Sequence, residues 1–135
     1  MARRRKQRSE VDWVVDDLIK KRVTDLVTGL SIDWVDPNRI YCVRSSGSTA
    51  RAYARIWGMN RVWQIAAGFA PAYVIEVVSE HFDKLDKKAQ DKVLLHEIAH
   101  IPKNFTGSLL AHTHSKGGFH DKLGRLERLY DRLTS

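Results

Sequence analysis

Cysteine is almost missing from this chain, since Cys42 is the only one among 135 residues. A single thiol excludes an intramolecular disulfide and a zinc site built from several cysteines, and it favours a reducing, cytoplasmic location. Long apolar runs are missing too, because none approaches the ~20 residues that a membrane-spanning helix needs. Met1 to Arg8 are rich in charge and no apolar stretch follows them, so we expect no secretory signal.

Acidic residues are scarce at the N-terminus, where the positive charge concentrates. The net charge is +7, from 23 Lys and Arg against 16 Asp and Glu, and five of the basic residues lie within residues 3–8. The other 18 basic residues nearly balance the 16 acidic ones, which leaves +2. We therefore expect a basic, disordered tail over residues 1–9 and a single domain over residues 10–135. Weak nucleic-acid binding through this tail is the alternative to a purely solvated end.

The pattern of apolar residues predicts an α+β domain. It consists of a short sheet of about three strands, packed with an N-terminal helix, a central helix and a C-terminal helix. We expect helices at 10–29, 59–67, 86–101 and 120–133, strands at 39–44, 51–57 and 73–78, and a long loop at 103–118 that contains Gly and His.

The most informative motif is His-Glu-Ile-Ala-His at residues 96–100, an HExxH sequence. In a helix, His96 and His100 lie on one face and can bind the same metal ion. Glu97 is close enough to reach a water on that ion without binding the ion itself. A metal held by two or three protein ligands activates water, and the Glu accepts its proton and later protonates the leaving amine. The motif therefore predicts a metal-dependent peptidase with Glu97 as general base and acid.

A third ligand must come from another part of the chain. The loop after the motif offers His112, His114 and His120, and the nearest acidic residues downstream are Asp121 and Glu127. Spacing alone does not choose among them. The pattern that would place a third His six residues after the second, followed by a methionine turn, is missing.

Three stretches of the chain resemble the metallopeptidase family of archaea and phages, a small SprT-like zincin group. They are RIYCVRSSGSTARAYARIWG at 39–58, YVIEVVSEHFDKLD at 73–86 and VLLHEIAHIPKNFTGSLLAH at 93–112. The last is the most specific, because HExxH is followed by Ile-Pro, an aromatic residue, Gly107 and a His five residues further on. The resemblance implies a zincin-like fold and one Zn²⁺ per chain, bound by His96, His100 and His112. It also implies a protein or peptide substrate that lies along the strand at 73–78.

Two other functions remain open at this point. One is a nucleic-acid-associated module with a structural metal, which a fourth histidine ligand would favour. The other is a small metal-dependent ribonuclease. Two polar residues in the predicted sheet, Arg44 and Glu76, have candidate roles at a catalytic site, but we expect both to form structural ion pairs. The four tryptophans are scattered, and we expect them to pack in or beside the core.

Overall fold

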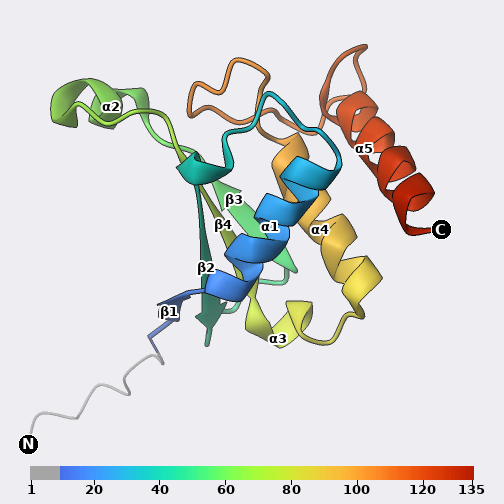
Figure 1. The fold of residues 1–135 in the computed structure, drawn as a ribbon. Coiled ribbons are helices and arrows are strands. Elements are labelled where there is room, and N and C mark those ends of the chain that lie inside the picture. Colours follow the sequence, from blue (N-terminus) through green and yellow to red (C-terminus); the bar gives the residue numbers. More distant parts are fainter. Residues whose placement is uncertain (1–9) are drawn as a thin grey trace, which may run out of the picture.

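The computed structural model describes residues 10–135, so the predicted basic tail over residues 1–9 lies outside the described part. Strands and helices are interspersed up to residue 78, and helices and a long loop make up the rest of the chain (Figure 1), which confirms the predicted α+β class. The elements are β1 Asp12–Val15, α1 Asp17–Gly29, β2 Ile40–Ser46, β3 Ala54–Trp57, α2 Arg61–Ala67, β4 Tyr73–Val78, α3 Ser79–Phe82, α4 Lys87–Ala99 and α5 Phe119–Thr134.

The described chain starts with a strand, although the sequence pattern predicts a helix over 10–29. That prediction is wrong for β1, which pairs antiparallel with β2 and places Val15 opposite Val43. Aromatic and β-branched residues fit a strand at least as well as a helix, and the neighbouring strand decides between them. The helix begins later because the carboxylate of Asp16 accepts a hydrogen bond from the backbone N–H of Ile19 at 2.9 Å.

The four strands form one mixed sheet in the order β1-β2-β4-β3. Strand β4 pairs in parallel with β2 and antiparallel with β3, so that Val77 has Arg44 on one side and Ala54 on the other. The expectation that the strand at 73–78 borders the substrate cleft is therefore wrong. Its nearly continuous apolar sequence suits an interior strand. Strand β3 is the free edge on that side, and it contacts α4.

Helices α1 and α4 cover one face of the sheet, and α5 packs against α4 (Figure 1). The core lies between these layers. Its fully buried members come from the sheet and from both covering helices, and they include Val23, Ile40, Ile75, Val77, Leu94, Leu95 and Ile98. Within residues 10–135, none of the helices combines the length and the apolar character required to cross a bilayer.

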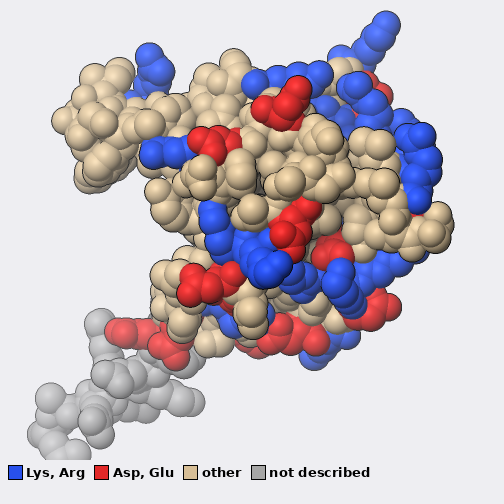
Figure 2. Space-filling model, viewed as in Figure 1, with Lys and Arg blue, Asp and Glu red and all other residues tan. Residues whose placement is uncertain are grey.

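The expectation that the tryptophans pack in or beside the core is wrong for Trp63, which is 64% exposed. Trp13 and Trp57 lie on the sheet face opposite α1 and α4, with 51% and 48% of their surface exposed. Their ring centroids are 6.4 Å apart. Trp63 belongs to α2, which protrudes with its flanking loops away from the sheet (Figure 1). Figure 2 shows few charged side chains on this protrusion, whereas positive and negative side chains intermingle over the rest of the visible face.

The structure confirms structural ion pairs for both polar residues of the sheet. The guanidinium of Arg44 joins the first helix to the loop after α3, since Nε lies 2.9 Å from Asp16 and Nη1 lies 2.5 Å from Asp83. Glu76 is fully buried on the opposite face, where its carboxylate accepts hydrogen bonds from Arg55 and from a serine and a tryptophan. A buried carboxylate with this many donors is stable in its charged form.

Candidate metal centre

Helix α4 presents the HExxH motif at its C-terminal end. The helix starts as the sequence predicts, because the carboxylate of Asp86 accepts a hydrogen bond from the N–H of Ala89 at 2.8 Å. Its last residue is Ala99, two residues earlier than predicted, and His100 follows in a near-helical conformation. Three apolar residues, Leu94, Leu95 and Ile98, are fully buried under the helix. Their packing fixes the rotation of the helix and leaves the imidazoles of His96 and His100 half-buried on another face.

Two hydrogen bonds fasten the following loop to the second motif histidine. The backbone N–H of Leu110 donates to the carbonyl oxygen of His100 at 2.7 Å. In the reverse direction, Nδ1 of His100 lies 2.6 Å from the carbonyl oxygen of Leu110. This double contact holds the chain two residues before His112 against the end of α4. Hydrogen bonds within the chain itself therefore position the loop.

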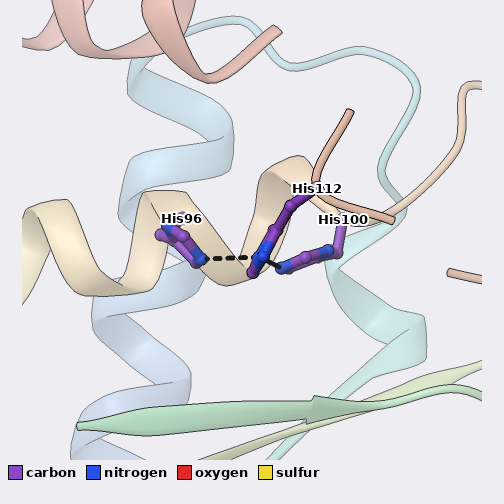
Figure 3. A group of neighbouring side chains, drawn as sticks. All are labelled: His96, His100 and His112. Atoms are coloured by element: carbon purple, nitrogen blue, oxygen red, sulfur yellow. Dashed lines mark hydrogen bonds between the residues drawn. The ribbon is translucent and has the colours of Figure 1, made fainter. Parts of the chain in front are cut away.

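The structure brings three of the predicted histidines together, as Figure 3 shows. Nε2 of His112 lies 3.2 Å from Nε2 of His96 and 3.0 Å from Nε2 of His100. All three ligand atoms lie within 4.8 Å of one another. Two nitrogens that are each ~2.05 Å from one tetrahedral ion lie ~3.3 Å apart, so the observed spacing fits a single zinc-sized ion.

Hydrogen bonding and burial favour the ligand form of these imidazoles. A carbonyl oxygen only accepts, so the contact with Leu110 places the proton of His100 on Nδ1 and leaves the Nε2 lone pair free. Burial, followed by the charges of His100 and His112, lowers the pKa of His96 to about 4. Burial also lowers the pKa of His100. Neutral imidazole is the form that binds metals, so both motif histidines are ready to bind near neutral pH.

Glu97 lies beside this cluster and is almost completely buried. Burial raises the pKa of its carboxyl group to about 8. Together with His96, Glu97 lines a pocket between α4 and β3. A carboxyl group that titrates near neutral pH in a pocket is suited to proton transfer.

A fully buried aromatic residue supports all three rings. The centroid of Phe119 lies 4.3 Å from that of His100, 4.7 Å from that of His112 and 4.9 Å from that of His96. Sequence reasoning gave this residue no role in supporting the three histidines. Phe119 stands at the start of the C-terminal helix, directly before His120, and this position in the sequence does not indicate that its ring contacts the three histidines.

A second support holds the loop from the side of the sheet. The hydroxyl of Tyr73 on β4 donates to the carbonyl of Ser108 at 2.8 Å and accepts from the N–H of Gly107 at 2.8 Å. The side chain of Gln64 on α2 donates to the carbonyl of Thr106 at 2.9 Å. Tyr73 is therefore a buried support of the loop.

The other candidate ligands stay apart from the cluster. The rings of His114 and His120 stack on each other at a centroid distance of 4.0 Å. The ring of His120 is nearer the cluster, with its centroid 6.2 Å from that of His112. The carboxylate of Asp121 accepts from the N–H of Gly117, and Glu127 lies further along α5. Within the described residues, the group that could hold a metal is therefore His96, His100 and His112.

Comparison with known proteins adds one match. Residues 11–127 match the family described as "Putative phage metallopeptidase". No curated protein and no solved structure matches the chain. The match covers all four strands, the HExxH helix and the histidine loop.

Proposed function

The chain belongs to the phage metallopeptidase family, and from this premise we propose that it is a zinc-dependent peptidase of the zincin class. His96, His100 and His112 hold the ion, one per chain, and Glu97 transfers the proton. The substrate is a protein or peptide. The observation that carries the proposal is the convergence of three Nε2 atoms, two of the separations being 3.0 and 3.2 Å.

The donor set fits the ion and leaves room for chemistry. Three imidazoles are a common ligand set for catalytic zinc, which keeps a fourth position for water or substrate. When bound, zinc polarises the scissile carbonyl and lowers the pKa of a water to ~7. The stacked pair of His114 and His120 lies outside the ligand group, so nothing in the arrangement favours a closed, four-ligand structural site.

Glu97 supplies the proton transfer. Its carboxylate accepts a proton from the attacking water, and the resulting carboxylic acid passes that proton to the nitrogen of the leaving amine. Burial raises the pKa of this carboxyl group, so once it has accepted the proton it holds it more readily than an exposed carboxylate would. The low exposure of the side chain keeps competing water away from this proton.

The free edge of β3 is the surface along which we propose that the substrate lies. The carbonyl of Tyr53 accepts from the N–H of Val78, so the backbone at residue 53 points toward β4. Backbone direction alternates along an antiparallel strand, which turns the N–H and C=O groups of Ala54 and Ile56 toward the free edge. An extended peptide can pair with these groups. Ile56→Pro removes one outward N–H and should raise KM while metal content is unchanged; an unchanged KM would argue against pairing at this edge.

Metal content measured together with peptide cleavage tests the proposal. The purified protein should hold about one zinc per chain and cleave an unfolded protein substrate. Glu97→Gln should keep the zinc and lose on the order of 10²-fold or more in turnover, because it loses the proton acceptor. His112→Ala should lose the zinc, whereas the matched control His114→Ala should keep it. Full cleavage by Glu97→Gln would overturn the mechanism, and equal zinc in both histidine variants would overturn the ligand set.

The same experiment separates the other functions. A structural metal module would keep its properties after Glu97→Gln, and a ribonuclease would degrade RNA and leave protein intact. Nucleic-acid binding through residues 1–8 stays a prediction. Deleting them should reduce affinity for DNA at matched salt, and equal affinity of the shortened protein would contradict it.

A further inference from the structure

An apolar pocket opens beside the proposed proton acceptor. It has a volume of about 490 Å³ and lies between the edge strand β3 and helix α4. Its walls come from the end of the preceding loop, from β3 and from one face of α4. The lining residues are Ala52, Tyr53, Ala54, Ala89, Lys92, Val93, His96 and Glu97.

The pocket owes its size to small side chains. Three alanines and a valine make up half of its lining. On α4, Ala89 and Val93 are one turn apart on one face, and His96 and Glu97 follow one turn later on the same side. The pocket therefore leads directly from the proton-transferring carboxyl group along the helix, and its volume lies in the range of pockets that enclose an organic group.

The charge around the pocket disfavours an acidic occupant. The ammonium of Lys92 is 3.1 Å from the carboxylate of Asp131 on α5, so the positive end is held outside and the methylene groups line the wall. The ring of Tyr53 packs edge-on against His81, with 6.4 Å between the ring centroids. A carboxylate entering here would lose hydration and meet the carboxyl group of Glu97 without gaining a free counter-charge.

We infer that this pocket is the subsite for the substrate side chain next to the scissile bond and that it selects a large apolar residue such as Phe or Leu. The inference rests on the proposed peptidase function and narrows its substrate class to chain segments that expose large apolar side chains, as unfolded proteins do. A peptide paired with β3 passes the mouth of the pocket, because Ala54 belongs both to the strand and to the lining.

A binding experiment tests the pocket without catalysis. The probes are two blocked tripeptides, acetyl-Gly-Phe-Gly-amide and acetyl-Gly-Ala-Gly-amide, added to the Glu97→Gln protein with its alanine methyl groups observed by NMR. The Phe peptide should shift the methyl signals of Ala52, Ala54 and Ala89, and the Ala peptide should shift them far less. Equal shifts from both peptides, or no shifts, would overturn the inference whatever the activity of the protein.

A cleavage experiment then compares variants on a denatured protein substrate, with the cut sites mapped by mass spectrometry. Ala89→Leu fills the pocket, and the matched control Lys88→Leu adds the same side chain at an exposed neighbouring position. Ala89→Leu should lower cleavage at large apolar residues about 10-fold or more, while Lys88→Leu should cut like the parent. Val93→Ala enlarges the pocket and should favour still larger residues, which provides a second variant if Ala89→Leu folds poorly.

The outcomes distinguish failure of the proposed subsite from failure of the proposed peptidase function. Cleavage by the parent without preference for large apolar residues, or an unchanged preference in both pocket variants, would overturn the subsite and leave the peptidase function standing. No cleavage by the zinc-loaded parent would overturn the peptidase function and the subsite with it.

Discussion

Tyr73→Phe is the perturbation that best separates support of the histidine loop from the chemistry of the site. The phenol is 1% exposed and contributes two hydrogen bonds of 2.8 Å, one donated to the Ser108 carbonyl and one accepted from the Gly107 N–H. Burial raises the pKa of this hydroxyl, so it keeps its proton and donates throughout the physiological range. The substitution removes one oxygen atom and leaves the ring in place, where it packs edge-on against Phe105.

The two lost bonds have unequal costs. Gly107 is buried, so its N–H is left without a partner, which costs about 1–3 kcal/mol. Ser108 is exposed, so its carbonyl can return to water at a cost of about 0.5 kcal/mol or less. We therefore expect a loss of about 2 kcal/mol in the free energy of unfolding, and a fall of roughly 8 °C in the melting temperature.

The same change should weaken metal binding, because the loop that carries His112 loses part of its anchorage. Loss of such an outer contact typically weakens metal affinity about 10-fold. Urea unfolding of the metal-free protein measures the change in the free energy of unfolding, and competition with a chelator measures zinc affinity. The control is Tyr41→Phe, at an exposed tyrosine of the same sheet. Metal-free stability within about 0.5 kcal/mol of the parent would refute the hydrogen-bond reasoning, and unchanged zinc affinity would refute the link to His112.

Three further changes test other parts of the structure. Gly107→Ala should destabilise the protein by about 2 kcal/mol in urea unfolding, because φ is +94° and the new carbon would lie 2.7 Å from the carbonyl oxygen of Met59; parental stability would contradict this. Burial raises the pKa of the Asp91 carboxyl, but hydrogen bonds from Arg22 and two other donors outweigh it and lower the pKa. The stabilisation that the charged Asp91 carboxylate provides should thus be complete above the unfolded pKa of ~3.9 and disappear as the pH falls through the lower folded pKa. Asp91→Ala should therefore lower the free energy of unfolding by ~3 kcal/mol at pH 7 and by less in acid. A loss that is the same at both pH values would contradict the assignment. Burial raises the pKa of Cys42 to about 12, so iodoacetamide should modify this thiol only after unfolding, and rapid modification of the native protein would contradict its burial.

Elements with a strong local signal could be predicted from the sequence. The HExxH helix has Asp86 as a side-chain cap at its start and Pro102 just beyond its end, and the C-terminal helix has leucines at helical spacing. The apolar run of β4 is recognisable as a strand for the same reason, since its β-branched residues favour extended backbone.

Features that depend on distant partners could not be predicted. The residues of β1 satisfy a helical period, and only pairing with β2 makes them a strand. The place of β4 inside the sheet follows from its parallel pairing with a strand more than thirty residues earlier, which no local pattern records. The sequence therefore predicts the wrong segment as the edge strand, although it locates both β3 and β4.

The candidate site likewise contains residues that the sequence predicts and a residue that it does not. Helical spacing alone places His96 and His100 on one face, because four residues make about one turn. Spacing does not distinguish His112 from His114, since both follow the helix in an irregular loop. The backbone of Leu110 makes the difference by bonding to His100 in both directions. Every residue other than proline has the same backbone carbonyl and N–H groups, so a contact of this kind leaves no mark in the sequence. The resemblance to a family is therefore needed to favour His112.

The protruding helix α2 supports the candidate metal centre although it carries none of the three histidines. Strand β3 ends next to Gly58, and the N–H of Met59 donates to the carbonyl of Gly107 at 2.9 Å. A β-carbon at Gly58 would lie 2.3 Å from that carbonyl oxygen, so the close approach requires a glycine. Gln64 holds the same loop from α2. The edge on which a peptide would pair and the loop that carries His112 are thus joined through one short segment. Displacement of that segment would move the substrate and the third histidine together, so substitutions at this junction should alter KM and zinc affinity in parallel rather than separately.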